Sequence, residues 1–332
     1  MDKYNHRERC QMILAGEKPD RFAASFWRHF FHMEHHAEGT IEAMVGFQKM
    51  LDWDFMKLNP RADYHAQGWG VQLEYSHHEF TKHGKSNFPV VTPDDWTKIQ
   101  RLPLSSPPLA EHLKVVAGIR KALGKELPIL MTVFTPLSVA GRLVENHQTL
   151  LEHLRSDPDS VQPALEAIAE TFAAFTSDLR NAGADGVFYA TTQWATRDML
   201  TWEEYERFGL PHDLKVIEAS ESDAINLLHV CESNNYLKQL AGLDHHCQLA
   251  NWDCCDPTNL PLDNASDQIK NLTLVGGVDQ NGWLLHSNPE EVGYQIDRIK
   301  SDHDPRRLII GPGCSIPPEI PMENLRAIRE KL

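Results

Sequence analysis

One histidine and two cysteines have the side chains and the spacing of a metal site. His229 and Cys231 stand two positions apart at the end of the apolar run 225–231, and Cys314 follows the Gly-Pro-Gly segment 311–313. Residues two apart in a strand point to the same face, so His229 and Cys231 are expected to lie together. Cys314 follows a second β-rich run, at 308–311. The pattern predicts a metal centre built from the ends of two strands.

Zinc is the ion that this set suits. It accepts thiolate and imidazole ligands, and catalytic zinc sites combine three protein ligands with one exchangeable position. Two thiolates and a neutral histidine balance the double charge, so a substrate thiolate in the fourth position would leave the centre at about −1. Such a sulfur is a nucleophile at neutral pH. A His-x-Cys pair alone also fits a buried strand cysteine that acts as a small hydrophobic residue, and Cys247, Cys254 and Cys255 are interpreted as structural thiols.

The surrounding pattern predicts the elements that would position these residues. Short β-rich runs alternate with longer amphipathic stretches, which indicates parallel strands joined by helices. Eight strands favour closure into a single (β/α)8 TIM barrel of the α/β class over residues 1–332, with an open doubly wound sheet as the alternative. The segment near 60–107 is irregular and is expected to form hairpins and loops over one mouth. The strands are expected at 22–26, 54–58, 129–133, 186–190, 225–230, 248–252, 272–278 and 308–311, and helices at 160–181, 202–222, 289–300 and from 318 to the C-terminus.

Charge and hydropathy exclude several classes of function. The chain has 32 Lys and Arg against 47 Asp and Glu, a net charge of −15, which disfavours binding to nucleic acid or to an anionic membrane surface. No signal peptide or membrane-spanning stretch is evident, so a cytoplasmic protein is expected. Six cysteines are too few for a disulfide scaffold of this length.

Several motifs point to a known family: His-Val-Cys at 229–231, Gly-Gly-Val-Asp at 276–279, Gly-Pro-Gly-Cys at 311–314 and Pro-Met-Glu-Asn at 321–324. Over nearly its whole length the sequence resembles the uroporphyrinogen decarboxylase superfamily. More narrowly, it resembles the branch that contains the methylcobalamin:coenzyme M methyltransferases. The resemblance implies a TIM barrel, a zinc ion held by His229, Cys231 and Cys314, and methyl transfer between a small thiol and a corrinoid or another methyl carrier. The corrinoid would be carried by a partner protein, and a homo-oligomer is an open alternative to a monomer.

Departures from the decarboxylase pattern narrow the expected reaction. True decarboxylases of the superfamily have paired arginines after the first strand and an aspartate after the second. Here Arg28 follows the first strand alone, and Asn59 stands after the second. Cys314 replaces a histidine that is typical of decarboxylases. Porphyrinogen decarboxylation is therefore disfavoured, although a decarboxylase-like enzyme and a non-catalytic metal-binding barrel remain as alternatives.

Further residues are predicted to support the site. Cobalamin-independent methionine synthases, distant relatives, use an additional carboxylate ligand, and Asp253 is the residue expected to supply it, unless it is a capping or loop aspartate. Arg28 is expected to hold an anionic group of the substrate or to form a surface salt bridge. Asp279 is expected to hydrogen-bond His229 or the substrate, or to cap the next helix. Cofactor- or pocket-binding residues, with packing as the alternative role, are expected to be Asn59, Tyr189 and Gln193.

Overall fold

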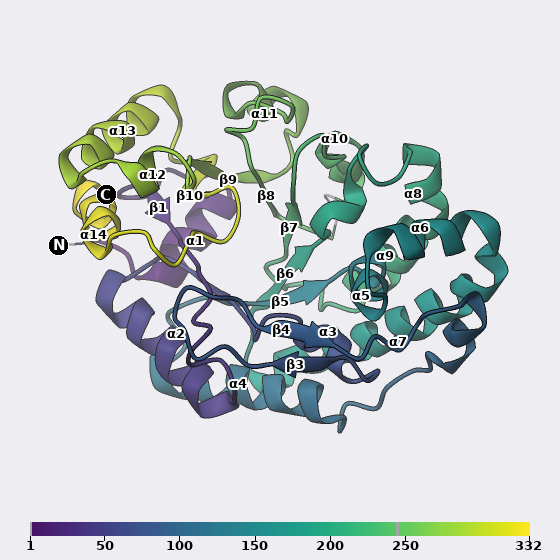
Figure 1. Cartoon of the computed structure of the whole chain (residues 1–332). Coiled ribbons are helices and arrows are strands. Elements are labelled where there is room, and N and C mark those ends of the chain that lie inside the picture. The colour runs from purple at the N-terminus through teal and green to yellow at the C-terminus, as the bar shows by residue number, and fades with distance from the viewer. Residues whose placement is uncertain (1, 244–245) are drawn as a thin grey trace.

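A parallel eight-stranded sheet forms the centre of the molecule. The computed structural model describes residues 2–243 and 246–332. The strands are ordered β1-β10-β9-β8-β7-β6-β5-β2, with helices between consecutive strands (Figure 1). Every strand predicted from the sequence is found, within a few residues at each end. The strands are β1 (Ala23–Ala24), β2 (Met56–Leu58), β5 (Ile129–Phe134), β6 (Gly186–Ala190), β7 (Leu227–Val230), β8 (Leu249–Trp252), β9 (Thr273–Val278) and β10 (Leu308–Pro312).

The first and last strands of this order meet and close the sheet. The backbone N–H of Asp54 donates to the carbonyl of Ala24 at 2.8 Å. The hydroxyl of Ser25 donates to the carbonyl of Phe55 at 2.7 Å. The closed order of eight parallel strands with helices outside confirms the predicted (β/α)8 TIM barrel.

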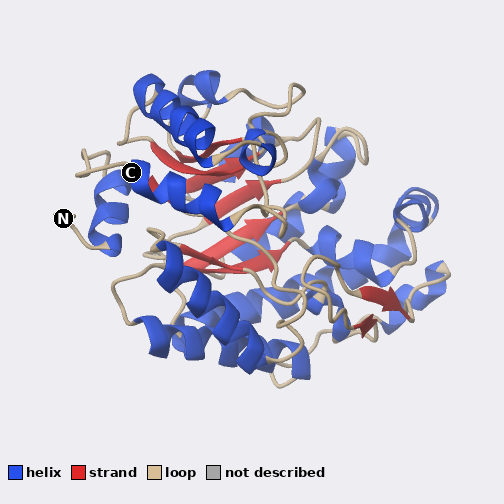
Figure 2. Ribbon diagram, turned by 60° about the vertical axis from the view of Figure 1, so that its left-hand side comes forward, coloured by secondary structure: helices blue, strands red, loops and turns tan. Residues whose placement is uncertain are grey.

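Two apolar layers lie on the two faces of the strands, as the period of two along a strand requires. Inward-facing side chains such as Leu130 and Phe188 form a core inside the barrel. Outward-facing side chains such as Met131 and Tyr189 pack beneath the helices. Figure 2 shows the strands side by side with the helices around them.

Helices cover the outside of the barrel. The predicted helix at 202–222 is divided into α8 and α9 at Gly209, because Pro211 has no N–H to continue the hydrogen-bond ladder. The helices are α1 (His6–Leu14), α2 (Ala37–Leu51), α3 (Tyr64–Gln67), α4 (Pro107–Leu123), α5 (Pro136–Leu143), α6 (His147–Ser156), α7 (Pro158–Ala182), α8 (Trp202–Phe208), α9 (Leu210–Ile217), α10 (Leu237–Leu240), α11 (Leu262–Gln268), α12 (Trp283–His286), α13 (Pro289–Asp302) and α14 (Met322–Lys331), with 3₁₀ turns η1 (Pro93–Lys98), η2 (Thr192–Ala195) and η3 (Ala241–Leu243).

The irregular segment near 60–107 contains a small antiparallel hairpin apart from the barrel sheet. Its strands are β3 (Gln72–Glu74) and β4 (Gly84–Ser86). Arg61, Asp63 and Lys82 of this segment line the same cavity as the ends of β7 and β10. The segment therefore lies at the mouth formed by the C-terminal ends of the strands.

The two termini lie near each other at the opposite end of the barrel (Figures 1 and 2). Arg329 of α14 pairs with Asp52 at 2.8 Å and with Asp2 at 3.6 Å. Among the residues that the structure describes, no helix has both the length and the apolar character needed to cross a membrane.

Candidate metal centre

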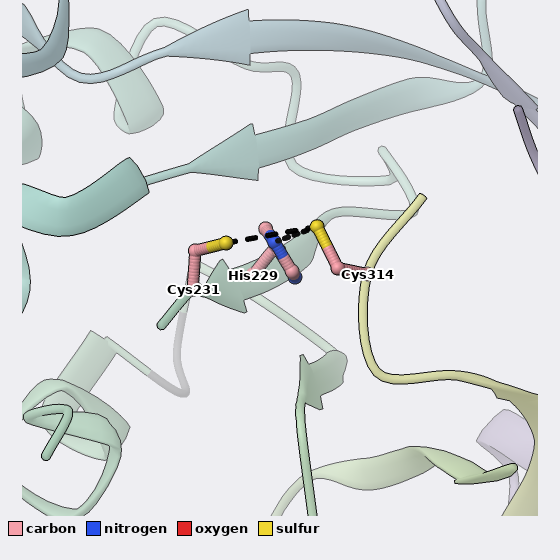
Figure 3. Close-up of side chains that lie close together, drawn as sticks. All are labelled: His229, Cys231 and Cys314. Carbon is pink, nitrogen blue, oxygen red and sulfur yellow. Dashed lines mark hydrogen bonds between the residues drawn. The ribbon is translucent and has the colours of Figure 1, made fainter. Parts of the chain in front are cut away.

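The three predicted metal ligands come together at the mouth of the barrel. His229 lies in β7, Cys231 follows that strand, and Cys314 follows β10. The two Sγ atoms are 3.6 Å apart, and Sγ of Cys314 is 3.7 Å from Nε2 of His229. In Figure 3 both sulfurs point toward each other across the imidazole. In the described part of the chain, this is the one group of His, Cys, Asp and Glu side chains whose geometry could hold a metal ion.

These distances fit a zinc ion. With Zn–S of about 2.3 Å and Zn–N of about 2.0–2.1 Å, two ligands of a tetrahedral site lie roughly 3.6–3.8 Å apart. The observed separations of 3.6 and 3.7 Å match the edges of such a tetrahedron. All three ligand atoms lie within 4.8 Å of one another, so a small movement of the side chains would complete the site.

Asn251 of β8 fixes the orientation of His229. Its amide nitrogen donates to the carbonyls of Val275 and Pro312 at 2.8 and 2.9 Å, so its oxygen faces the imidazole. That oxygen lies 2.6 Å from Nδ1 of His229. Because an amide oxygen can only accept, Nδ1 carries the proton and Nε2 keeps its lone pair for a metal.

A cavity of about 240 Å³ opens beside the three ligands. Its walls combine the strand ends with the segment after β2. Aromatic side chains of β5 and β6 and of Trp27, which follows β1, form the apolar part, and several cations also line the cavity. The lining residues are Trp27, His29, Lys57, Pro60, Arg61, Ala62, Asp63, His65, Lys82, Thr132, Phe134, Arg142, Phe188, Ala190, Thr192, His229, Cys231, Cys314 and Ser315.

The titratable groups of the cavity are perturbed by burial and by each other. The hydrogen bond between the two thiols lowers the pKa of Cys314, with His229 acting in the same direction, and raises the pKa of Cys231. Burial lowers the pKa of Lys57 to about 7, against the opposing effect of the two cysteines. Burial also lowers the pKa of His65 to about 3, so this imidazole is neutral at pH 7. Both of its ring nitrogens are buried without a hydrogen-bond partner.

Two aspartates that the sequence analysis expected beside the metal, Asp253 and Asp279, are not part of the group of candidate ligand side chains. Asp279 does not bond His229; its carboxylate accepts from the N–H of Gly282 at 2.7 Å, next to α12. Asp253 accepts from the N–H of Cys255 at 3.0 Å and from the amide of Gln280 at 3.3 Å. It is absent from the described group of ligand side chains. Both aspartates satisfy backbone donors in their own loops, and Asn251 is the partner of His229 that the sequence interpretation missed.

The remaining predicted residues lie around the cavity and do not line it. Arg28 forms a salt bridge with Glu79 at 2.8 Å. A salt bridge was the alternative to substrate binding that the sequence analysis gave for Arg28. Tyr189 points out of the barrel, where its hydroxyl donates to Asp213. Gln193 bonds His147 at 2.8 Å.

Asn59 lies beside the cavity and contacts two residues that line it, Lys57 and Ser315. Its amide oxygen accepts from Lys57, and its amide nitrogen lies 3.4 Å from the hydroxyl of Ser315, the residue after Cys314.

Of the cavity residues that the sequence analysis did not identify, only some had a recognisable signal in the sequence. Lys57 is a charged residue within an otherwise apolar strand, Phe55 to Leu58, which is itself unusual for an inward position. His65 lies in the irregular segment, where no periodicity indicates the direction of a side chain.

Comparisons with known proteins agree with this geometry. Over 238 residues the chain is 26% identical to the methylcobamide:CoM methyltransferase MtbA of Methanosarcina mazei, covering 71% of this chain and 67% of that protein. It is 26% identical over 260 residues to a methylated-thiol–coenzyme M methyltransferase of the same organism, covering 70% of this chain and 65% of that one.

A solved structure described as a methyltransferase from Methanosarcina mazei has the same fold. It aligns with a TM-score of 0.81 at 17% identity over 99% of both chains. The model of the uroporphyrinogen decarboxylase (URO-D) family matches residues 15–332. With almost the entire barrel and all three site residues inside that match, the chain belongs to the uroporphyrinogen decarboxylase family.

Proposed function

We propose that this protein is a zinc-dependent methyltransferase that moves a methyl group between a corrinoid, carried by a partner protein, and a small thiol. The observation that carries the proposal is the convergence of His229, Cys231 and Cys314 at the barrel mouth, with two of the three ligand-atom separations, 3.6 and 3.7 Å, matching the edges of a zinc tetrahedron. Relatives named as methylcobamide:CoM and methylated-thiol–coenzyme M methyltransferases support the reaction. A zinc ion held there would lower the pKa of a bound thiol and supply a nucleophilic sulfur.

The chain's own residues prepare the thiol for reaction. Three side chains would hold the ion and leave one coordination position for the substrate sulfur, and Asn251 holds His229 in the tautomer that this requires. Phe134 and Phe188 form an apolar wall that limits water around the sulfur. At about 240 Å³ the cavity is smaller than the roughly 300–1,000 Å³ typical of pockets for drug-sized ligands, which suits a small thiol.

The transfer balances without a further reactant. The thiol gives its proton to solvent, and its sulfur attacks the methyl carbon in line with the cobalt–carbon bond. That bond breaks, its electron pair stays on cobalt, and the product is a neutral methyl thioether. The barrel contributes by holding the sulfur at the mouth, where a corrinoid on a partner can approach.

Metal content and methyl transfer test the proposal together. We expect the purified protein to hold about one zinc ion per chain, and Cys231→Ala and Cys314→Ala to lose most of it. Cys255→Ala is the matched control, because Cys255 is exposed and lies outside the group of ligand side chains. Methyl transfer from methylcobalamin to 2-mercaptoethanol, followed by cobalamin absorbance, should disappear with the metal. A native protein free of zinc, or one that holds zinc but transfers no methyl group to any thiol of a panel, would contradict the proposal.

A further inference from the structure

Lys57 is a buried cation that faces the metal cavity from inside the barrel. It lies in the middle of β2, is 6% exposed, and lines the cavity with Cys231 and Cys314. Its Nζ lies 4.7 Å above the ring of Phe188, whose centroid is 5.0 Å from that of His229. A stack of three side chains thus runs from the lysine to the histidine.

Unlike the other buried cations, Lys57 makes no direct ion pair with a carboxylate in the described part of the chain; Glu34 attracts its ammonium only at longer range. Arg9 pairs with Asp20 and Asp54, and Arg61 pairs with Glu111. Lys57 makes one hydrogen bond, to the amide oxygen of Asn59, and no ion pair among the described residues. A buried ammonium without a partner in direct contact is costly, which is why burial lowers the pKa of Lys57 to about 7. A negative group beside Nζ would favour the charged form, so such a group is expected there in the working state.

The cysteine ligands alone do not supply that charge once the ion is bound. Two thiolates would neutralise a divalent ion, so the ion and its two cysteines together would offer Lys57 no net negative charge. A third thiolate, from the substrate, would bring the net charge of the centre to −1, which balances the positive charge of Lys57. Methylation converts that sulfur to a neutral thioether and removes the match.

We infer that Lys57 is a specificity-determining residue that makes the site bind a thiolate in preference to its methyl thioether. The inference rests on the proposed function and adds a reason for product release. Asn59 positions the ammonium, because it accepts from Nζ and also lies 3.4 Å from Ser315, the neighbour of Cys314. This is the role that the structure gives to the asparagine predicted as a cofactor-binding residue.

A pair of uncharged probes isolates the charge on sulfur. Binding of 2-mercaptoethanol and of 2-(methylthio)ethanol to the zinc-loaded protein is measured by titration calorimetry, with the zinc content of each variant determined in parallel. We expect the wild type to bind the thiol more tightly than the thioether. Lys57→Met should lower thiol affinity by roughly 10- to 100-fold, with thioether affinity and zinc content unchanged.

Conservative and control variants separate charge from packing. Lys57→Arg should restore the preference, and Lys57→Gln, which keeps a polar contact to Asn59, should lose it even if the methionine variant folds poorly. Lys85→Met is the matched control, since Lys85 is partly buried on β4 but does not line the cavity.

Equal loss of both affinities, or an unchanged preference in Lys57→Met and Lys57→Gln, would overturn the role of Lys57 while leaving the proposed function standing. Failure of the zinc-loaded wild type to bind any thiol would overturn both.

Discussion

At the scale of single residues, the side chains of the candidate metal site could be predicted from the sequence to lie together, and the residues that support them could not. His229, Cys231 and Cys314 are recognisable because few residue types bind a soft metal. Asn251 gives no such signal, because it is an ordinary amide inside β8 whose importance comes from facing three groups on β7, β9 and β10. Asp279 was the more obvious choice by chemistry, yet the backbone of its own loop takes its carboxylate.

Replacing Asn251 should weaken metal binding by more than a general loss of fold stability would. Asn251→Leu removes the acceptor of Nδ1 and is expected to lower zinc affinity by about 10- to 100-fold, measured by competition with a chelator. Asn251→Asp keeps that acceptor and should lose less. Asn324→Leu is the control, because Asn324 is equally buried and also donates to two carbonyls, of Leu284 and Ser287, away from the site. Equal losses of zinc affinity in the two leucine variants would contradict the orienting role.

At the scale of elements, sequence patterns located the strands but not which way each side chain faces. The strand at 186–190 was predicted with correct bounds. The sequence does not show, however, which of its two alternating sets of side chains faces the inside of the barrel. In the structure Phe188 and Ala190 face the cavity, and Tyr189, which was predicted to shape it, packs under the helices. The single helix expected at 202–222 was wrong because the effect of Pro211 was overlooked.

The turn that carries Cys314 depends on close packing between two loops. A Cβ added at Gly313 would lie 2.6 Å from Cα of Asp253, where backbone cannot yield. Gly313→Ala is therefore expected to displace Cys314, to lower zinc affinity and to destabilise the fold by about 1–3 kcal/mol. The control is Gly46→Ala in α2, where a Cβ meets nothing within 4 Å and helix propensity should add about 0.5–1 kcal/mol of stability. Urea unfolding and chelator competition measure both effects; unaltered zinc affinity in Gly313→Ala would refute the argument.

At the scale of the whole molecule, the two ends of the barrel have separate tasks. The mouth holds the cavity and the candidate metal site, while the opposite end is closed by a dense ionic network. Asp54 accepts from Arg9 and Arg21 there, and His6 of α1 bonds Asp52 at 3.0 Å and Asp54 at 3.2 Å. The sequence predicted the barrel but not this network, since the charges lie far apart along the chain.

This network makes stability depend on pH through His6. Burial acts to lower the pKa of His6, but the hydrogen bonds to Asp52 and Asp54 outweigh it and raise the pKa to about 9, above the unfolded value of about 6.5. The stabilisation is complete below pH 6.5 and is lost as pH rises through 9. We expect about 1–2 kcal/mol of unfolding free energy to be lost between pH 6.5 and 9.5 in the wild type, and less in His6→Gln.

Urea unfolding across this pH range provides the measurement. His78→Gln, at an exposed histidine without an ion pair among the described residues, should keep the wild-type pH dependence. Identical pH profiles for the wild type and His6→Gln would show that this interaction does not contribute.

The separation of the ligands along the chain has a consequence for unfolding. Cys231 and Cys314 are 83 positions apart, so an ion bound by both would act as a reversible cross-link around β8, β9 and the helices between them. Closing a loop of that length restricts the unfolded chain more than closing a short loop does, by about 0.6 kcal/mol for each doubling of loop length. Loading the ion would then stabilise the C-terminal third of the barrel as a unit, and proteolysis of that third would become a sensitive gauge of metal occupancy.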